Sequence, residues 1–362
     1  MKKFNVINVA IIGCGKIAEK HALILTSKIF KRFRLVGVCD SNKKKAMSFG
    51  KKFNIKYFNN IDVLLKSTST NLAVICTSSG NHYLNALAVS KYKIDLVIEK
   101  PISLNLLDAN KIVKIFNNDN KKLFVVMQNR LNPLIKYLKE AISKNILGKI
   151  SNISIKVWWC RDQKYYDEAA WRGTWEDDGG IFMNQAIHHL DMMTWLMGPV
   201  KSVSAIIKRR LVKIETEDTG SAILEFKNGV IGTIEASTAI RPKNLENSIT
   251  VMGDKGNIKI GGLYMNNLEI NQTKNKKIAN ILLKKFLKIN NKNNHFLFYE
   301  HVLENLTNKK KKGKHIDGKE AIKSLEIVTA IYQSVIKKKR IYLPLKAKVK
   351  NKKSKLLSEL KN

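Results

Sequence analysis

Polar side chains that can handle protons stand at helical spacing in GGIFMNQAIHHLDMMTWLMG, residues 179–198. Intervals of four, three and four place one column on a helical face: Asn184, His188, Asp191 and Trp195. An imidazole with an ordinary pKa of about 6.5 exchanges protons at neutral pH, and a neighbouring amide can hold a hydroxyl. The apolar side of the same helix carries Met183, Ile187, Leu190 and Met197. The column predicts either a catalytic face lining a cleft or a solvated face with one core histidine.

A lysine at the end of a predicted strand is the second candidate for chemistry. Lys100 lies in VIEKPIS, directly after an apolar run. Doubly wound sheets bind their ligands at the carboxyl ends of the parallel strands. Burial there would disfavour the charged form of the amine and so favour proton exchange. A cis peptide before Pro101 would turn Lys100 sideways; the alternative is an ordinary strand-end lysine that reaches solvent.

A phosphate-binding loop is predicted at GCGKIA, residues 13–18, which follows a first strand and opens a helix. Gly13 permits a tight turn, Gly15 lets the backbone approach a pyrophosphate, and the helix N-terminus offers free N–H groups. Asp40 ends the second strand, where a carboxylate binds ribose hydroxyls and repels a 2′-phosphate. These features predict NAD in preference to NADP, whereas the lysines at 43–45 would favour a 2′-phosphate.

Two regions with different strand patterns must position these residues. Up to residue 125, short Val/Ile/Leu runs alternate with helical stretches, which is typical of a parallel sheet buried on both faces. Beyond it, longer strands joined by the turns KNGV and GDKG predict a mainly antiparallel sheet, and residues 318–339 predict a long helix. We therefore expect an α/β protein. It should have a doubly wound Rossmann domain over 1–125, an α/β domain with a large open sheet over 126–345, and a basic, disordered tail over 346–362.

The composition limits the class of protein. No apolar run approaches the ~20 residues of a membrane-spanning helix, so no integral membrane contact is predicted. The four cysteines are far apart, which indicates neither a zinc site nor a disulfide framework and favours the cytoplasm. Lys and Arg number 66 against 29 Asp and Glu, a formal charge of +37. The lysines are spread over every segment without a nucleic-acid motif, so no specific nucleic-acid partner is predicted. The basic segment 278–289 is compatible with a membrane surface, but a solvated helix face is expected.

The order and spacing of GCGKIA, EKP, GGIFMNQAIHHLD and the closing YLPL resemble the Gfo/Idh/MocA oxidoreductases, up to about residue 345. The resemblance implies a Rossmann domain that binds NAD and a C-terminal domain whose open sheet makes homodimers or homotetramers. Lys100 and His188 match the family's catalytic lysine and histidine, and Asn184 falls where many members have aspartate. The segments RDQKYYDEAAWRGTWEDDGG, QNRLNP and ETEDTG resemble the subgroup that oxidises C3 of UDP-N-acetylglucosamine or its uronic acid, where Asn also occurs.

The resemblance implies a hydride transfer that needs no metal. Hydride leaves C3 of the UDP-sugar for NAD while a base removes the hydroxyl proton. Either Lys100 or His188 takes that proton, and the other can stabilise the developing charge on oxygen. The 3-keto sugar would then pass to an aminotransferase in surface-polysaccharide or lipid A synthesis. A dehydrogenase of a free sugar or inositol and a non-catalytic cofactor-binding sensor remain the alternatives.

Further site residues are predicted around these groups. Asp191 would orient His188 or support packing, and His189, about 100° away on the helix, is expected to be structural. Arginine forks suit a phosphate or a uronic carboxylate, and aromatic rings near them either stack on the sugar or uracil or pack internally. The predicted substrate-binding residues are Asn184, Arg161, Tyr166, Trp171, Arg172 and Gln185, with Tyr165 as a further aromatic candidate. The predicted cofactor-binding residues are Gly13, Gly15, Lys16, Ile17, Asp40, Thr77, Ser78, His82, Glu99, Lys100 and Gln128.

Overall fold

The computed structural model describes residues 6–287, 293–308, 316–345 and 353–360. The chain forms two compact units: residues 1–126 with 295–322, and residues 127–294 with 323–362. The return of 295–322 to the first unit differs from the expected single boundary at 125/126. Its cause is apolar burial, because Tyr299 from this segment is fully buried and packs against Phe30 and Phe33. The lysine-rich stretches 309–315 and 346–352 lie outside the described residues.

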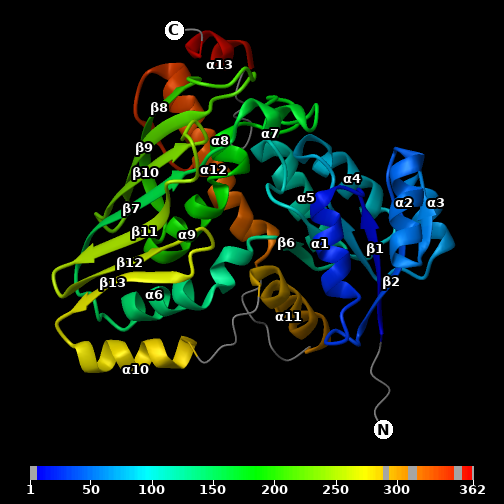
Figure 1. The fold of residues 1–362 in the computed structure, drawn as a ribbon, viewed down its shortest axis with the longest axis horizontal. Coiled ribbons are helices and arrows are strands. Elements are labelled where there is room, and N and C mark those ends of the chain that lie inside the picture. Colours follow the sequence, from blue (N-terminus) through cyan, green and yellow to red (C-terminus); the bar gives the residue numbers. More distant parts are fainter. Residues whose placement is uncertain (1–5, 288–292, 309–315, 346–352, 361–362) are drawn as a thin grey trace. The chain divides into compact units, whose positions relative to one another are not determined.

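The first unit is built on a six-stranded parallel sheet in the order β3-β2-β1-β4-β5-β6 (Figure 1). The strands are β1 Ile7–Ile12, β2 Phe33–Cys39, β3 Lys56–Phe58, β4 Leu72–Ile75, β5 Asp95–Ile98 and β6 Leu123–Val125. Every residue of β4 is buried, which explains why its sequence is an unbroken apolar run. The strand order is that of a dinucleotide-binding Rossmann sheet and confirms the expected fold.

Three of the described helices of this unit begin where an asparagine side chain caps them. The helices of the unit are α1 Lys16–Leu25, α2 Lys43–Phe53, α3 Ile61–Ser67, α4 His82–Ser90, α5 Leu106–Asn118 and α11 Asn294–Thr307, with a 3₁₀ turn η1 over Ser79–Asn81. Asn42, Asn60 and Asn105 each accept a hydrogen bond from a backbone N–H three residues on, which fixes the starts of α2, α3 and α5. Helix α1 differs, because Gly15 stands at its N-cap and no side chain caps it.

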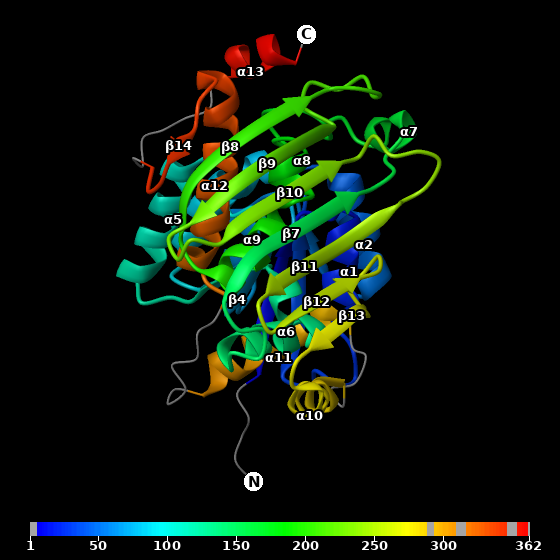
Figure 2. The ribbon, with the colours of Figure 1, turned by 90° about the vertical axis from the view of Figure 1, so that its left-hand side faces the viewer.

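The second unit is built on an eight-stranded sheet in the order β13-β12-β11-β7-β10-β9-β8-β14. The strands are β7 Ile150–Trp158, β8 Val200–Lys208, β9 Thr219–Phe226, β10 Ile231–Ser237, β11 Glu246–Gly253, β12 Gly256–Gly261, β13 Asn267–Thr273 and β14 Ile341–Tyr342. The expected hairpins β9–β10 and β11–β12 are present, and β7 with β10 is a parallel pair in an otherwise antiparallel sheet. Figure 2 looks onto the face that the described helices leave uncovered.

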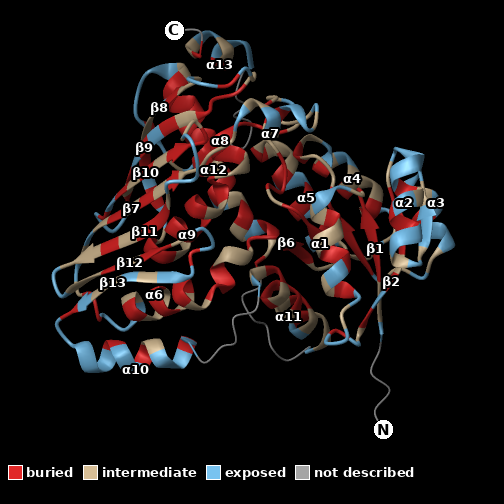
Figure 3. Cartoon of the chain, viewed as in Figure 1, coloured by how far each residue is buried: buried red, intermediate tan, exposed pale blue. Residues whose placement is uncertain are grey.

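Helices cover the other face of this sheet. The described helices of this unit are α6 Pro133–Ser143, α7 Gln163–Asp167, α8 Ile181–Asn184, α9 Ile187–Met197, α10 Lys276–Leu287, α12 Gly318–Lys337 and α13 Lys353–Glu359, with a 3₁₀ turn η2 over Gln128–Leu131. Residues 327–335 of the expected long helix α12 are all buried (Figure 3). No described helix is both long and apolar enough to cross a membrane.

The end of the chain differs from the expected disordered tail. Residues 353–359 form α13, and Leu356 and Leu360 are 1% and 4% exposed. Lys353 lies 3.0 Å from the Glu215 carboxylate and Lys338 lies 3.6 Å from Glu359. Burial of two leucines is the physical reason that this lysine-rich segment becomes ordered.

Candidate active site

The glycine loop of the first unit has the geometry that an anion requires. Gly13 has φ +93°, and a Cβ there would meet the backbone of Cys76 and Thr77 within 2.9 Å. A Cβ on Gly15 would meet nothing within 4 Å, so the backbone at Gly15 borders open space. Lys16 and Ile17 begin α1, whose uncapped N–H groups and positive dipole end suit a pyrophosphate.

Asp40 is held in place beside this loop. Its Oδ2 accepts a hydrogen bond from Cys14 N at 2.9 Å, and its Oδ1 accepts one from Asn42 N at 2.8 Å. Each carboxylate oxygen can accept a further hydrogen bond, so the half-buried side chain can still receive ribose hydroxyls. The loop and Asp40 therefore fit NAD, which supplies the hydride acceptor when it is bound.

The predicted contacts at the end of β4 divide into two kinds. Thr77 and Ser78 are half-buried, and Thr77 Oγ1 accepts a hydrogen bond from Asn85. His82 is 1% exposed, and its two ring nitrogens lie 2.7 Å from Pro101 O and 3.2 Å from Thr77 O. Burial lowers the pKa of His82. The His82 ring links two loops from inside the unit, and its contact with the cofactor stays a prediction.

Glu99, the next predicted cofactor contact, has a carboxylate that points into the interior. It is 7% exposed, with Oε1 2.9 Å from His21 Nε2 and Oε2 accepting from Lys100 N at 3.1 Å. Burial raises the pKa of Glu99, but hydrogen bonds from His21 and His295 outweigh it and hold that pKa well below its usual value. His21, Glu99 and His295 lie close enough to hold a metal ion, yet His21 is already bonded to Glu99 and to Tyr299 at 2.7 Å.

Lys100 follows β5 at the carboxyl edge of the sheet, as expected from the sequence. Its peptide bond to Pro101 is cis, and its side chain is half-buried. The backbone N–H of Lys100 is tied to Glu99, which is itself tied to His21. The segment before the lysine is therefore fixed from within the unit.

In the second unit, the single helix expected over 179–198 is two helices. Gly179 and Gly180 have φ +82° and +91°, and α8 starts directly after them. The helical turn is wider at Ala186, because its N–H donates to Ile181 O five residues back. Helix α9 begins at the next residue. Asn184 and His188 thus stand on successive helices, and both are half-buried.

Asp191 belongs to a structural ion pair. Its two carboxylate oxygens accept hydrogen bonds of 2.6 Å from Arg130 Nε and Nη2. The two side chains are only 2% and 6% exposed, and the guanidinium lies 5.8 Å from the centre of the Trp195 ring. Of the two predicted roles for Asp191, this geometry supports packing. Arg130, within QNRLNP, carried no prediction of its own.

His189 lies in the core, as expected of a structural histidine. It is 1% exposed and its Nε2 is 2.7 Å from Asn247 Oδ1. Burial lowers its pKa to about 4, although the hydrogen bonds to Asn247 and to the Gln185 backbone oppose that shift. The neutral ring also makes an edge contact with Trp159 at 6.1 Å.

Asn184 is oriented by a carboxylate that the sequence analysis did not single out. Its Nδ2 donates to Asp178 Oδ1, and Asp178 Oδ2 accepts from Gly173 N at 2.8 Å. Asp178 is 4% exposed and lies in the EDDGG stretch. This contact fixes which end of the Asn184 amide faces Asp178.

Two predicted arginines enclose one tyrosine ring. The guanidinium of Arg172 lies 4.1 Å and that of Arg161 5.1 Å from the centre of Tyr165. Gln185 Nε2 donates to the Tyr165 hydroxyl at 3.3 Å. Arg172 Nη1 also donates to Tyr165 O at 2.5 Å and to Glu168 at 2.8 Å. Tyr165 is therefore the centre of a cationic cluster formed by Arg161, Tyr165, Arg172 and Gln185.

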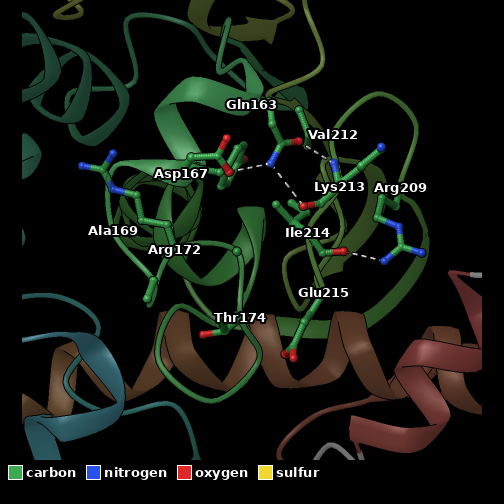
Figure 4. Close-up of a pocket in the computed structure, with 13 residues that line it drawn as sticks. Gln163, Asp167, Ala169, Arg172, Thr174, Arg209, Val212, Lys213, Ile214 and Glu215 are labelled. Atoms are coloured by element: carbon green, nitrogen blue, oxygen red, sulfur yellow. Dashed lines mark hydrogen bonds between the residues drawn. The ribbon is translucent and has the colours of Figure 1, made fainter.

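A cavity of about 680 Å³ lies beside this cluster (Figure 4). Arg172, Arg209 and Lys213 line it together with the acids Asp167 and Glu215. Tyr166 also lines it, but it is 8% exposed and its hydroxyl is 2.9 Å from Thr238 Oγ1, so of its two predicted roles this geometry supports internal packing. Of the other predicted residues, Trp171 is half-buried, and Gln128 starts η2 in the second unit.

Comparisons with known proteins account for both units. Residues 7–127 match the oxidoreductase family with an NAD-binding Rossmann fold, and residues 135–259 match the Gfo/Idh/MocA C-terminal domain. The WlbA dehydrogenase from Chromobacterium violaceum, solved in complex with NADH and UDP-GlcNAcA, is 33% identical, with a TM-score of 0.88 over 96% of this chain and 98% of that chain. The WlbA dehydrogenase from Bordetella pertussis, also solved with NADH and UDP-GlcNAcA, is 33% identical, with a TM-score of 0.87 over 94% of this chain and 99% of that chain.

A more distant relative has a different named activity. Myo-inositol 2-dehydrogenase from Thermotoga maritima is 27% identical over 256 residues, which are 69% of this chain and 74% of the relative. The match to the family over both units, together with the 33% identity over nearly the whole chain, is decisive. The chain belongs to the Gfo/Idh/MocA family of NAD-binding oxidoreductases.

Proposed function

We propose that the protein oxidises the C3 hydroxyl of a UDP-linked N-acetylhexosamine, or of its uronic acid, to a 3-keto sugar with NAD. The observation that carries this proposal is the 33% identity, over nearly the whole of each chain, to two dehydrogenases solved with NADH and UDP-GlcNAcA. The cluster of Arg161, Tyr165 and Arg172 supports it, because two guanidinium groups beside one ring suit a substrate that carries anionic groups.

Lys100 and His188 are the proposed catalytic residues. One of them removes the proton of the C3 hydroxyl, and the other holds that oxygen while negative charge develops on it. Asn184 would hold a sugar hydroxyl, with its amide already oriented by Asp178. The helix that carries His188 is anchored by its buried side, on which Ile187 and Leu190 are fully buried.

The arginines are proposed to recognise the charged part of the substrate. Arg172 has a side chain that is 12% exposed and is already fixed by Tyr165 O and Glu168, so little conformational entropy remains to be lost on binding. A bidentate guanidinium contact fits a diphosphate oxygen pair or a uronic carboxylate. Arg161, which stacks between Trp159 and Tyr165, is the second such group.

A homodimer or homotetramer is part of the same proposal. Figure 2 shows the uncovered face of the eight-stranded sheet. Neighbouring strands carry exposed apolar side chains on one face. Ile206 on β8 is 70% exposed, Ile223 on β9 is 59% exposed and Ile231 on β10 is 48% exposed. Large apolar side chains that share an exposed face are typical of a protein interface.

The competing proposal is a dehydrogenase of a free sugar or inositol, which the similarity to myo-inositol 2-dehydrogenase favours. The test is to incubate the protein with NAD and a panel of UDP-GlcNAc, UDP-GlcNAcA, myo-inositol and free hexoses. A 2-oxo acid is added in a parallel series to reoxidise a cofactor that stays bound. We expect reduced cofactor and a 3-keto product with a UDP-sugar only. Turnover of inositol or a free sugar at a higher kcat/KM would replace this proposal by the competing one.

A further inference from the structure

Glu217 is a buried acid that the proposed reaction does not use. It lies in ETEDTG just before β9 and is 1% exposed. Its Oε1 is 2.8 Å from the Tyr332 hydroxyl and accepts from Phe182 N at 3.2 Å. A Cβ on Gly180 would overlap the Glu217 carboxyl group, so this side chain packs directly against the glycine turn that precedes α8.

The hydrogen bonds of the Tyr332 hydroxyl show which groups must donate and which must accept. Its hydroxyl has a single hydrogen, yet it lies 2.7 Å from Gly179 O and 2.8 Å from Glu217 Oε1. A backbone carbonyl can only accept, so a hydroxyl that donates to Gly179 must accept from Glu217. Glu217 can donate only when it is protonated. The three groups then form one chain, from Glu217 through Tyr332 to Gly179 O.

The second oxygen of Glu217 supports the same protonation state. Among the described residues, Oε2 has no hydrogen-bond partner and is buried from solvent. A buried anionic oxygen without a donor is strongly disfavoured, whereas the carbonyl oxygen of a neutral acid tolerates that surrounding better.

The groups around Glu217 also disfavour a negative charge on its carboxyl group. Among the described residues, the titratable groups that act on it include Asp178, from the loop before α8, and Tyr332, from α12. The adjacent Asp218 accepts from the backbone N–H groups of residues 210, 211 and 212. Burial raises the pKa of Glu217 to about 8, with a smaller contribution from Asp178, although the hydrogen bonds that link its carboxyl group to Tyr332 and to Phe182 N oppose that shift.

We propose that Glu217 is a positioning residue that, as a neutral carboxylic acid, donates to Tyr332 and thereby holds the Gly179–Gly180 turn from which α8, the helix with Asn184, starts. Helix α9, with His188, follows α8 after Ala186. Loss of the proton reverses the donor order, because Tyr332 must then donate to the carboxylate and release Gly179 O. The catalytic consequence rests on the proposed function, whereas the state of the turn does not.

The first arm of the test measures the turn without any substrate. Hydrogen exchange of residues 179–189 is compared at pH 6 and pH 9 in the full-length protein, in Glu217→Gln and in Glu217→Leu. Glutamine stays neutral at both pH values and keeps a donor for Tyr332, and leucine removes the donor. Glu225→Gln is the matched control, because Glu225 lies near the other end of β9 with its side chain 34% exposed and bound to Lys201.

At pH 9 the ionised form of an acid with a pKa of about 8 is about ten times as abundant as its neutral form. We therefore expect the unmodified segment to exchange about tenfold faster than Glu217→Gln at pH 9 and at the same rate at pH 6. Glu225→Gln should follow the unmodified protein at both values, and Glu217→Leu should exchange faster at both. Equal exchange of the unmodified protein and Glu217→Gln at pH 9, or normal protection in Glu217→Leu, would overturn the proposal.

The second arm separates positioning from mere stability. With a UDP-sugar that is turned over, Glu217→Gln should retain kcat at pH 9, where the unmodified protein loses about tenfold relative to pH 7, with NADH affinity unchanged in both. A kcat profile that is identical for the two proteins would refute the positioning role even if exchange differs. If no UDP-sugar is turned over at any pH, the proposed function fails, and the exchange arm alone decides the state of the turn.

Discussion

His189 should make the protein lose stability in mild acid. Burial lowers its pKa in the folded protein to about 4 from an ordinary value of 6.5, a difference of about 2.5 units. Below pH 6.5 the unfolded chain therefore binds a proton at this histidine that the folded chain does not bind. The contribution of the neutral, buried ring to the free energy of unfolding is fully present above pH 6.5 and is lost as the pH falls toward 4. At about 1.36 kcal/mol per pKa unit, His189 can lower the free energy of unfolding by at most about 3.4 kcal/mol, and at pH 4.5 it lowers it by about 2.5 kcal/mol.

The assay is urea unfolding at pH 8 and pH 4.5 for the unmodified protein, His189→Gln and His188→Gln. Glutamine cannot take the proton and keeps a donor for Asn247 Oδ1, so we expect the acid loss of His189→Gln to be smaller by about 2.5 kcal/mol. His188 is half-buried on the same helix, and its variant should keep the full acid loss while losing turnover. The reasoning is refuted if His189→Gln loses as much stability in acid as the unmodified protein.

Three further predictions follow from single contacts. Arg130→Met should lower the free energy of unfolding by about 3–5 kcal/mol, because it leaves the Asp191 carboxylate buried without its cation, and Arg130→Met/Asp191→Leu should recover most of it; urea unfolding checks both, and an equally unstable double variant would contradict it. Asp40→Ala should weaken the binding of NAD and reduce the preference of the protein for NAD over NADP, as measured by the KM of each cofactor; an unmodified protein that prefers NADP would contradict this prediction. Deletion of 353–362 should lower the melting temperature through the lost burial of Leu356 and Leu360 but leave turnover within about twofold; a large fall in kcat would mean that α13 supports the site.

The first unit could largely be predicted because its signals are local. Unbroken apolar runs mark strands buried on both faces, and the glycines of residues 13–18 have their expected surroundings. The return of residues 295–322 could not be predicted, since it depends on contacts such as that between His21 and Tyr299, 278 positions apart. The inward orientations of His82 and Glu99 likewise depend on partners from other segments.

The second unit shows where periodicity alone is insufficient. A regular 3.6-residue pattern gave one helix over 179–198, but the wide turn at Ala186 divides it, and no residue type there signals the break. The buried acids Asp178 and Glu217 were visible in EDDGG and ETEDTG only as parts of a resemblance. Their partners, Asn184 and Tyr332, lie 6 and 115 positions away, so only the fold reveals the contacts.

The central claim is that hydride leaves C3 of a UDP-sugar under the action of Lys100 and His188. The most direct measurement uses UDP-GlcNAcA carrying deuterium at C3, with mass spectrometry of the cofactor after a single turnover. We predict that deuterium appears on the reduced cofactor, that His188→Ala and Lys100→Met each slow its appearance by about 10²–10⁴-fold, and that the double variant is much less than multiplicatively slower. Reduced cofactor without deuterium, or transfer at the normal rate in both single variants, would contradict the claim.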